Sequence, residues 1–465
     1  MSEWQERMYP LLPIFAQNLV CDLHGYSQYK LRYGGEFQEL LDWLEETEWW
    51  SDEEIQEYQN IQLRKLVQHA YATVPYYQRV FDELKLKPDD IQSTAHLQKL
   101  PILTKEDVHK YMGDMISSEF KPNELVFVHT SGTTGKSLQF YMEPRAFQFR
   151  WAVWWRHRKW FGIEFDSPYA SFTGLSAVPL QQTAPPFWRE NRPMHQTIFT
   201  MHHIVPEKID AIVARLNRYG FDYYHGYPSI IYNLAVLIQE HNQEITRPPK
   251  IIFTGAENLY EDQRQAMREV IKCPVTDHYG FSEGCGNASR CSEDLYHEDF
   301  EYGILECVNP ELLGDGSIRG NIIATGFGSY AMPFIRYDVG DVGTWVTTNC
   351  KCGRRSKTLI RVEGRTEDYI ITPEGRKIMR FDYIFKDTHS IKEAQVVQRE
   401  LGSLCLRVVR RSSYSISDEE FLREEINRRV SAKIKVKFEY VEEIGRETSG
   451  KFQAVKSEIR EVKTA

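Results

Sequence analysis

The sequence predicts an α/β protein with a large N-terminal domain of mostly parallel sheets and crossover helices, followed by a small α+β domain. Between residues 124 and 284, short apolar strands, glycine-containing turns and helices alternate, which is typical of parallel strands joined by crossover helices. After residue 390 the pattern changes to three strand-like runs and one helix. The chain has 465 residues, of which 42% are hydrophobic, so it is long enough for two domains with packed cores.

The large domain opens with a helical part, which we place at about residues 1–120. The segments 36–50 and 54–74 are its clearest helical stretches. After Pro122 the character changes, and strands are expected at 124–130 and 138–142, on either side of a glycine-rich loop.

Strand–turn–helix units follow the loop. The segment 206–220 begins with proline, ends at glycine and carries apolar residues at helical spacing, which predicts a helix. Those apolar residues are Ile209, Ile212, Val213 and Leu216. The segments 250–257 and 274–283 are expected to be buried strands that end in turns. Because ligands bind at the carboxyl ends of parallel strands, we expect these turns and the glycine-rich loop to form one site.

The small domain is expected to contain strands at 394–400, 405–411 and 435–441 and a helix that opens with Ser417 and Asp418. The segment "VEGRTEDYIITPEGRKI" precedes these elements and is interpreted as the junction. We therefore predict a first domain at 1–363, a hinge at 364–368 and a mobile C-terminal α+β domain at 369–465.

Charge and composition exclude some functions. A net charge of −9 argues against a nucleic-acid partner, which requires a basic surface. The sequence contains no run of about 18 apolar residues and no signal-peptide pattern, so we expect a cytoplasmic protein without a transmembrane segment. The apolar segment 9–26 is expected to pack on its own domain, with peripheral membrane contact left open. The aromatic and basic segment 151–161 is expected to be an amphipathic helix on the core.

The stretch "HTSGTTGKSLQFY", residues 129–141, has the composition of a phosphate-binding loop. It does not fit the Walker A pattern, because Thr130 occupies the first glycine position and a strand, not a helix, is expected after the lysine. Two glycines still allow a tight turn that presents N–H groups to anionic oxygens. The residues expected to contact phosphate are Thr130, Ser131, Gly132, Thr133, Thr134, Gly135 and Lys136.

Six motifs in order resemble those of the adenylate-forming enzymes, which include acyl-CoA synthetases, peptide-synthetase adenylation domains and luciferases. The motifs are "HTSGTTGKSLQFY", "TGAENL" (254–259), "DHYGFSEG" (277–284), "FIRYDVGD" (334–341), "EGRTEDYIITPEG" (363–375) and "RETSGKFQAV" (446–455). The resemblance covers the chain from about residue 60. It implies that ATP and Mg²⁺ are used to join a carboxylic acid to AMP with release of pyrophosphate. The acyl group then passes to an acceptor such as CoA or an amine.

The resemblance implies roles for residues at the ends of two predicted strands. Ala256 and Glu257 would belong to the adenine pocket. The aromatic ring of the third motif would stack on adenine, the hydroxyl would contact the α-phosphate, and the glutamate would bind Mg²⁺. Those positions are Tyr279, flanked by His278 and Gly280, then Ser282, then Glu283.

The three remaining motifs imply further roles. Asp341 would bind the ribose hydroxyls, whereas Asp338 and Val339 depart from the family pattern, so only the role of the aspartate is transferred. Arg365 would contact ribose or phosphate, and Glu367 falls at the hinge position. Lys451 would drive adenylation as a catalytic residue, with Glu283 and Lys136.

The cysteines suggest a metal. Cys350 and Cys352 form a C-x-C pair, and Cys291 lies six residues before His297. Three thiolates and one imidazole suit a closed tetrahedral Zn²⁺ site of structural type. Cys285 is a competing ligand, and four unrelated side chains are the alternative.

Within the superfamily, the N-terminal sequence resembles the CapK-like proteins of the phenylacetate-CoA ligase branch, which also includes coenzyme F390 synthetases. That resemblance points to surface-polysaccharide or secondary metabolism. The acid pocket is expected to use Tyr224, His225 and Tyr227. Two other functions stay open: an adenylyltransferase that leaves AMP on its target, and a non-catalytic nucleotide-binding protein.

Overall fold

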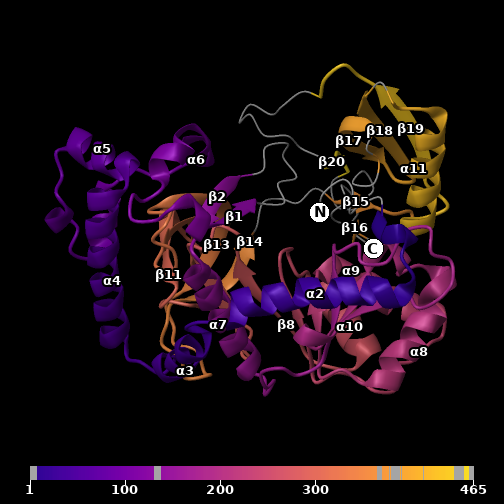
Figure 1. Ribbon diagram of the computed structural model, residues 1–465, viewed down its shortest axis with the longest axis horizontal. Helices are drawn as coiled ribbons and strands as arrows, with labels where there is room; N and C mark the ends of the chain where they lie inside the picture. The colour runs from indigo at the N-terminus through magenta and orange to yellow at the C-terminus, as the bar shows by residue number, and fades with distance from the viewer. Residues whose placement is uncertain are drawn as a thin grey trace. The chain divides into compact units, whose positions relative to one another are not determined.

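The computed structural model describes residues 8–129, 138–363, 369–375, 377, 378, 388, 390–411, 413–444 and 455–459. These residues divide into two compact units, a larger one up to residue 363 and a smaller one from residue 369 (Figure 1). The helices of the larger unit are α2 (Ile14–Tyr33), α3 (Phe37–Thr47), α4 (Asp52–Thr73), α5 (Pro75–Leu84), α6 (Lys105–Tyr111), α7 (Pro144–Lys159), α8 (Ile209–Tyr219), α9 (Pro228–Glu240) and α10 (Glu261–Ile271).

The larger unit also contains strands, most of which form one large sheet. They are β1 (Val126–His129), β2 (Gln139–Met142), β3 (Tyr169–Thr173), β4 (Trp188–Asn191), β5 (Gln196–Thr200), β6 (Tyr223–Gly226), β7 (Ile251–Thr254), β8 (Val275–Gly280), β9 (Asn287–Arg290), β10 (Tyr296–Glu298), β11 (Gly303–Leu312), β12 (Ile318–Gly326), β13 (Tyr337–Val346) and β14 (Thr358–Glu363). Twelve of them form one sheet in the order β11-β12-β13-β14-β10-β9-β8-β7-β6-β3-β5-β4.

The sheet is parallel in one part and antiparallel in the other. Strands β5, β3, β6, β7 and β8 run parallel, and the crossover connections between them carry helices α8, α9 and α10. From β8 through β9, β10, β14 and β13 to β11 every pairing is antiparallel. The predicted α/β class is therefore confirmed. The parallel order holds for the strand–turn–helix region, and the sheet as a whole is mixed because hairpins, not crossover helices, connect the later strands.

The parallel strands are covered by helices on both faces. Phe172, Tyr224 and Ile252 point to one face and pack with apolar residues of α8, α9 and α10. Tyr223 and Phe253 point to the opposite face and pack with α3 and α7. Because side chains alternate along a strand, neighbouring residues such as Tyr223 and Tyr224 belong to different cores.

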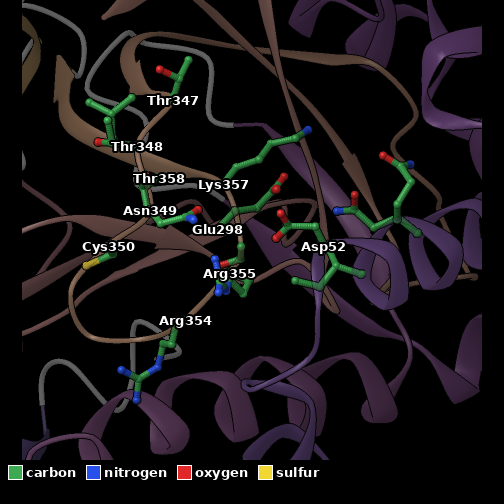
Figure 2. A pocket seen from close by; sticks show the side chains of 15 residues that line it. Asp52, Glu298, Thr347, Thr348, Asn349, Cys350, Arg354, Arg355, Lys357 and Thr358 are labelled. Carbon is green, nitrogen blue, oxygen red and sulfur yellow. The ribbon is translucent and has the colours of Figure 1, made fainter.

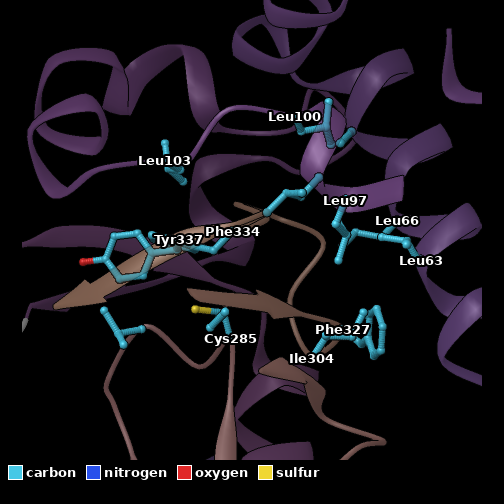
Figure 3. Packing of buried hydrophobic residues seen from close by; sticks show 14 of the residues in the cluster. Leu63, Leu66, Leu97, Leu100, Leu103, Cys285, Ile304, Phe327, Phe334 and Tyr337 are labelled. Atoms are coloured by element: carbon cyan, nitrogen blue, oxygen red, sulfur yellow. The ribbon is translucent and has the colours of Figure 1, made fainter. Parts of the chain in front are cut away.

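The helical layer packs on the antiparallel part. Leu63 and Leu66 of α4 lie in one buried cluster with Ile304, Phe327 and other residues of these strands (Figure 3). Helix α4 starts at a capping box: the Ser51 N–H donates to Glu54 Oε2 at 2.8 Å and the Glu54 N–H donates to Ser51 Oγ at 3.3 Å. The helical character predicted for this region is confirmed.

Helix α2 packs on the edge strand β4 through its polar side. Asn18 Oδ1 accepts the N–H of Glu190 at 3.1 Å, and Asp22 Oδ1 accepts the N–H of Arg192 at 2.8 Å. The first bond satisfies an N–H group that the edge strand would otherwise leave unpaired, and the second binds the residue that follows the strand. The apolar side of the helix faces outward as a result, and Phe15 is 74% exposed. Among the helices that the structure describes, none is long and apolar enough to span a membrane.

Strands β1 and β2 form an antiparallel pair on either side of the glycine-rich loop. The strand expected after the loop is thus present where a Walker A loop would have a helix. The loop itself, residues 130–137, lies outside the described residues.

In its described residues, the smaller unit is a four-stranded sheet with helix α11. The sheet order is β19-β18-β17-β20, and a separate pair is formed by β15 and β16. The elements are β15 (Ile370–Ile371), β16 (Lys377–Ile378), β17 (Ile391–Glu400), β18 (Ser403–Arg410), α11 (Ile416–Arg429), β19 (Lys435–Tyr440) and β20 (Val455–Ser457). The α11 N-cap is Ser415, not Ser417 as expected, because the Ser415 N–H donates to Asp418 Oδ2 at 2.7 Å, three residues further on.

Candidate active site and metal site

Tyr279 and Asp341 come from the two parts of the sheet and meet. Tyr279 lies near the carboxyl end of β8, and Asp341 lies on β13. The Tyr279 hydroxyl donates a hydrogen bond of 2.8 Å to Asp341 Oδ2. Burial and the nearby Asp341 carboxylate raise the pKa of Tyr279 well above its usual value, so the phenol keeps its proton and donates. Two predicted site residues, 62 positions apart, therefore share one hydrogen bond.

Glu283 lies in the turn after β8 and is also tied to β13. Tyr337, the first residue of that strand, donates its hydroxyl to Glu283 Oε1 at 3.0 Å. The side chain of Glu283 is only 9% exposed. Beside it, the backbone oxygen of Ser282 accepts a hydrogen bond of 2.7 Å from Arg150 Nη2 on α7. The turn is thus fixed on both sides, with one carboxylate oxygen of Glu283 bound to the Tyr337 hydroxyl.

Ala256 and Glu257 follow the parallel strand β7. Ala256 has a φ of 66°, a left-handed conformation that is uncommon for alanine and occurs often at functional sites. Glu257 Oε2 accepts the N–H of Ser229 at 3.1 Å, which ties the turn to the start of α9. These contacts hold the turn at the same sheet edge as Tyr279.

His278 lies under helix α7, with its ring centroid 4.7 Å from that of Trp154. A Cβ added to Gly255 would lie 2.7 Å from this ring, so the turn after β7 needs glycine there. Burial and the positive charge of Arg158 lower the pKa of His278 to about 3, which makes the imidazole neutral at physiological pH.

The three predicted acid-pocket residues face different surroundings. Tyr224 is fully buried in the core formed with α8, α9 and α10. His225 points to the opposite face of the sheet, toward α7. Tyr227 caps helix α9, and its N–H donates to Phe172 O at 2.9 Å. Of the three, His225 is the one that shares a sheet face with His278.

Three cysteines and one histidine converge at a second place in the larger unit. The ligand atoms of Cys291, His297, Cys350 and Cys352 all lie within 4.8 Å of one another. The Cys291 and Cys350 sulfurs are 3.7 Å apart, and Cys352 Sγ lies 3.3 Å from His297 Nε2. Two sulfurs bound at about 2.3 Å to a tetrahedral Zn²⁺ would be separated by roughly 3.8 Å. The donor set and its spacing therefore fit such an ion.

The loop that carries Cys350 and Cys352 is held by the N-terminal helices. Arg354 pairs with Glu48 at 3.2 Å and lies over the ring of Trp160 at 3.8 Å. The same loop forms one wall of a pocket of about 260 Å³, and Asp52 and Glu298 lie on another side of it (Figure 2). The competing ligand Cys285 is not part of the convergent group, since it lies in the apolar core with Phe334 and Tyr337 (Figure 3).

The chain is similar to known proteins over most of its length. A model of the CapK C-terminal domain family matches residues 370–458. Protein CapK of Staphylococcus aureus is 26% identical over 406 residues, which cover 85% of this chain and 86% of that protein. Phenylacetate-coenzyme A ligase of Aromatoleum evansii is 29% identical over 70% of this chain and 74% of its own length.

Residues 370–458 thus match the CapK C-terminal domain family, and most of the chain is similar to CapK and to phenylacetate-CoA ligase. A solved structure of 2-hydroxyisobutyryl-CoA ligase, in complex with 2-HIB-AMP and CoA, has the same fold, with a TM-score of 0.58 at 19% identity. The alignment covers 88% of this chain and 91% of that one.

Several residues assigned from the adenylate-forming family lie outside the described residues. They are Thr130, Ser131, Gly132, Thr133, Thr134, Gly135, Lys136, Arg365, Glu367 and Lys451. Their roles stay predictions. The described residues that are predicted to bind the nucleotide all belong to the larger unit.

The sequence analysis did not single out two residues that contact the candidate site. Tyr337 lies inside the motif "FIRYDVGD", four positions before Asp341. Its place in the same motif could have indicated that it lies near the site. Arg150 lies one residue before the aromatic and basic segment that was interpreted as a core helix. Nothing in the sequence shows that its guanidinium reaches the turn at Ser282, because that contact depends on how α7 packs across the sheet.

Proposed function

We propose that this protein is an ATP-dependent ligase that activates a carboxylic acid as an acyl-adenylate and then forms a thioester with CoA. In the first step a carboxylate oxygen attacks the α-phosphorus of ATP and the bond to pyrophosphate breaks. In the second step the CoA thiolate attacks the acyl carbonyl carbon and AMP leaves. The observation that carries the proposal is the hydrogen bond from Tyr279 to Asp341, because it joins two nucleotide motifs in one place.

The described residues have separate tasks in the first step. The ring of Tyr279 stacks on adenine, and Asp341 accepts hydrogen bonds from the ribose hydroxyls. Glu283 has an oxygen besides the one that Tyr337 binds, and it is the residue that would hold Mg²⁺. A bound Mg²⁺ supplies positive charge where two anions must approach each other. Arg150, through the backbone of Ser282, keeps this turn in position.

Lysines and an arginine from the undescribed segments add positive charge. Lys136 in the glycine-rich loop is proposed to bind the outer phosphates and to assist pyrophosphate release. Lys451 is proposed to act in adenylation, and Arg365 to contact ribose or phosphate. Charge neutralisation of this kind supplies most of the catalysis in phosphoryl and nucleotidyl transfer.

The two steps are proposed to use two orientations of the small domain, with Glu367 at the hinge. The 2-hydroxyisobutyryl-CoA ligase is known in postadenylation, thioesterification and open states, which supports an alternation of this kind. CoA is the acceptor favoured by the names of the relatives. An amine acceptor, and a place in surface-polysaccharide or secondary metabolism, stay predictions.

A structural Zn²⁺ is proposed at Cys291, His297, Cys350 and Cys352. The site joins the β9–β10 turn to the loop between β13 and β14. Strand β10 pairs with β14 through only two residue pairs, Tyr296 with Leu359 and His297 with Thr358. A metal would therefore strengthen the narrowest join in the sheet, between the strands that carry Tyr279 and Asp341.

Exchange of labelled pyrophosphate into ATP, measured over a panel of carboxylic acids, tests the proposal. We expect exchange with at least one acid and a thioester product when CoA is added. An AMP group that stays attached to the target would favour the adenylyltransferase alternative. A protein that binds ATP but supports no exchange with any acid would be non-catalytic, and the proposal would be wrong.

Location and surface contacts stay predictions. A cytoplasmic location is expected, and peripheral membrane contact through the exposed apolar side of α2 is left open. Sedimentation of the protein with lipid vesicles, compared with a Phe15→Ser variant, would test that contact.

A further inference from the structure

The face of the parallel sheet that α7 covers contains a buried cation without a counter-ion. Arg158 is 3% exposed, and its Nη1 donates to Trp154 O at 2.8 Å. Its guanidinium lies 5.2–5.6 Å from the ring centroids of Trp155, Tyr223 and Phe253. No carboxylate of the described residues forms an ion pair with it. A buried charge of this kind is costly unless an opposite charge pairs with it.

Arg156, on the same helix, shows the usual arrangement. It is equally buried and pairs with Asp299 at 2.5 Å and with Glu301 at 2.6 Å. The chain thus provides carboxylates for one buried arginine of α7 and leaves the other facing aromatic rings. The difference indicates that the partner of Arg158 is not supplied by the described part of the protein.

A row of polar atoms without partners lies on the same sheet face. Ser171 on β3 and His225 on β6 are neighbours in register, and Thr173 is the last residue of β3. Ser171 Oγ, Thr173 Oγ1 and His225 Nδ1 are buried and have no hydrogen-bond partner among the described residues. Alternation along the strands places all three on the side of Tyr169 and Tyr223, which pack with α7.

The charges around this row are positive. Burial lowers the pKa of His225 well below its usual value, and Arg158 and Arg32 lower it further. Arg32, on α2, lies 4.3 Å over the ring of Trp151 and has no ion-pair partner among the residues described. A neutral imidazole, two hydroxyls and two arginines without counter-ions form a surface suited to an anion that also accepts or donates hydrogen bonds.

The row continues into the nucleotide site. It lies at the carboxyl ends of parallel strands, where ligands bind in sheets of this kind. His278 occupies the same face two strands from His225, with Trp154 of α7 against its ring. Tyr279, the next residue, is the one that bonds Asp341. An acid with its reacting carboxylate at the nucleotide could therefore extend its other end toward Arg158.

We propose that this face binds the distal end of the acid substrate and that the substrate carries a second anionic group there, as a dicarboxylic acid does. The proposal rests on the acid-activating function given above and specifies its substrate class. Arg158 binds the distal anion, and Ser171, Thr173 and His225 bind polar groups along the chain of the acid. Arg158 is thus a specificity-determining residue.

Pairs of acids of equal chain length provide the test. Succinate, glutarate and adipate are compared with butyrate, pentanoate and hexanoate in ATP–pyrophosphate exchange. We expect kcat/KM to be at least about 10-fold higher for the best diacid than for its matched monoacid, because the monoacid leaves Arg158 unpaired. Equal values, or a preference for the monoacids, would overturn the proposal.

An Arg158→Met variant separates specificity from structure. Methionine fills a similar volume without charge, so the variant is expected to fold and to lose about 10- to 100-fold in kcat/KM for the diacid, with monoacid exchange unchanged. An equal loss with every acid, or a rise in KM for ATP alone, would contradict the role. If this variant does not fold, Ser171→Ala is expected to raise KM for the diacid, and an unchanged KM would count against the row.

Arg215→Met is the matched control. Arg215 also lies over aromatic rings, but it is on α8 and pairs with Glu190 at 2.7 Å, so its replacement is expected to leave the diacid preference unchanged. Calorimetric titration with glutarate and pentanoate distinguishes the two proposals. Glutarate binding without exchange would support the anion site and contradict the ligase function. Exchange with monoacids only would support the ligase function and contradict the anion site.

Discussion

At the scale of single residues, the hydrogen bond between Tyr279 and Asp341 sets the state of both groups. Burial keeps the Tyr279 phenol protonated, so it acts as a donor and Asp341 as an acceptor. Removing the phenol hydroxyl would allow the Asp341 side chain to change its rotamer. Removing the charge of Asp341 would weaken the proposed hydrogen bonds to the ribose hydroxyls directly.

Tyr279→Phe and Asp341→Asn are therefore expected to differ in size of effect. The first keeps the ring and should raise KM for ATP by about 3- to 10-fold, the value of one hydrogen bond that orients a charged group. The second should raise KM further and lower kcat/KM by at least about 100-fold, because a charged acceptor is lost. Pyrophosphate exchange at varied ATP measures both. A larger loss in Tyr279→Phe than in Asp341→Asn would contradict these roles.

Three buried histidines predict sensitivity to acid. Burial lowers the pKa of His157 and His225 well below the usual value, and that of His278 to about 3. In the unfolded chain histidine titrates near 6.5. The unfolded state therefore binds protons that the folded state does not as the pH falls below about 6.5, so stability present above that pH is lost toward lower pH.

We expect each of these histidines to reduce the free energy of unfolding by about 2 kcal/mol at pH 5 relative to neutral pH. Urea unfolding between pH 5 and 7 measures the dependence. His157→Gln keeps a donor for Arg290 O, which His157 Nε2 contacts at 2.8 Å, and removes one titrating group. Between pH 5 and 7 its mean slope of stability against pH should be smaller by about 1 kcal/mol per pH unit. The same slope in the wild type and the variant would mean that the pKa of His157 does not differ between the folded and unfolded states.

Some site residues could be predicted from the sequence and others could not. Tyr279, Glu283 and Asp341 lie in motifs whose residue types and order carry information. Arg158 has no such signal, because an arginine in an aromatic helix is equally compatible with a surface position. Its burial without a carboxylate follows from the way α7 lies on the sheet, which local sequence does not specify.

At the scale of elements, the join between β10 and β14 is the part of the sheet with least pairing. Two residue pairs connect these strands, whereas β11 and β12 pair over most of their length. The cysteine and histidine ligands lie at this join, two on each side. Metal binding would therefore hold β10 to β14, which lie between the strands β8 and β13 that carry Tyr279 and Asp341.

A Cys350→Ser, Cys352→Ser double variant should lose its metal and become less stable. We expect about one Zn²⁺ per chain in the wild-type protein, and a loss of several kcal/mol in the free energy of unfolding in the variant. Metal analysis and urea unfolding measure these changes. Hydrogen exchange should also become faster in residues 296–298.

The matched control is Cys307→Ser, since Cys307 lies on β11 outside the ligand group. It should keep the metal and the slow exchange of β10. Folded wild-type protein purified without chelators that contained no metal would exclude the site. Metal retained in the double variant would mean that other residues bind it.

Most helices and strands could be predicted from the sequence, but the order of the strands in the sheet could not. The helix at 209–219 follows from its apolar spacing and from Gly220, which adopts a φ of 69° as the cap. The strand order β13-β14-β10-β9-β8 brings together segments separated by many residues, and hairpin lengths alone do not determine it. That order explains why the predicted parallel arrangement applies to only part of the sheet.

At the scale of the whole molecule, the predicted function requires residues from both units. Tyr279, Glu283 and Asp341 belong to the larger unit. Lys451 belongs to the smaller unit, where it follows strand β19 in the sequence. In the proposed reaction, Lys451 would act in the first step and the acceptor would enter in the second. Two orientations of the small domain would allow both, and the connecting segment would then rotate about few backbone bonds.

Glu367→Pro tests this rotation, since proline fixes φ near −65° and restricts the backbone before it. We expect pyrophosphate exchange within about 3-fold of the wild type and thioester formation lowered by at least about 10-fold, because only the second step requires the turned domain. Glu367→Ala removes the same side chain without restricting φ and should support both steps. Loss of exchange in a folded Glu367→Pro variant, or full thioester formation, would contradict rotation at this residue. An equal loss of thioester formation in the alanine variant would mean that the Glu367 carboxylate, and not the backbone rotation, is needed for the second step.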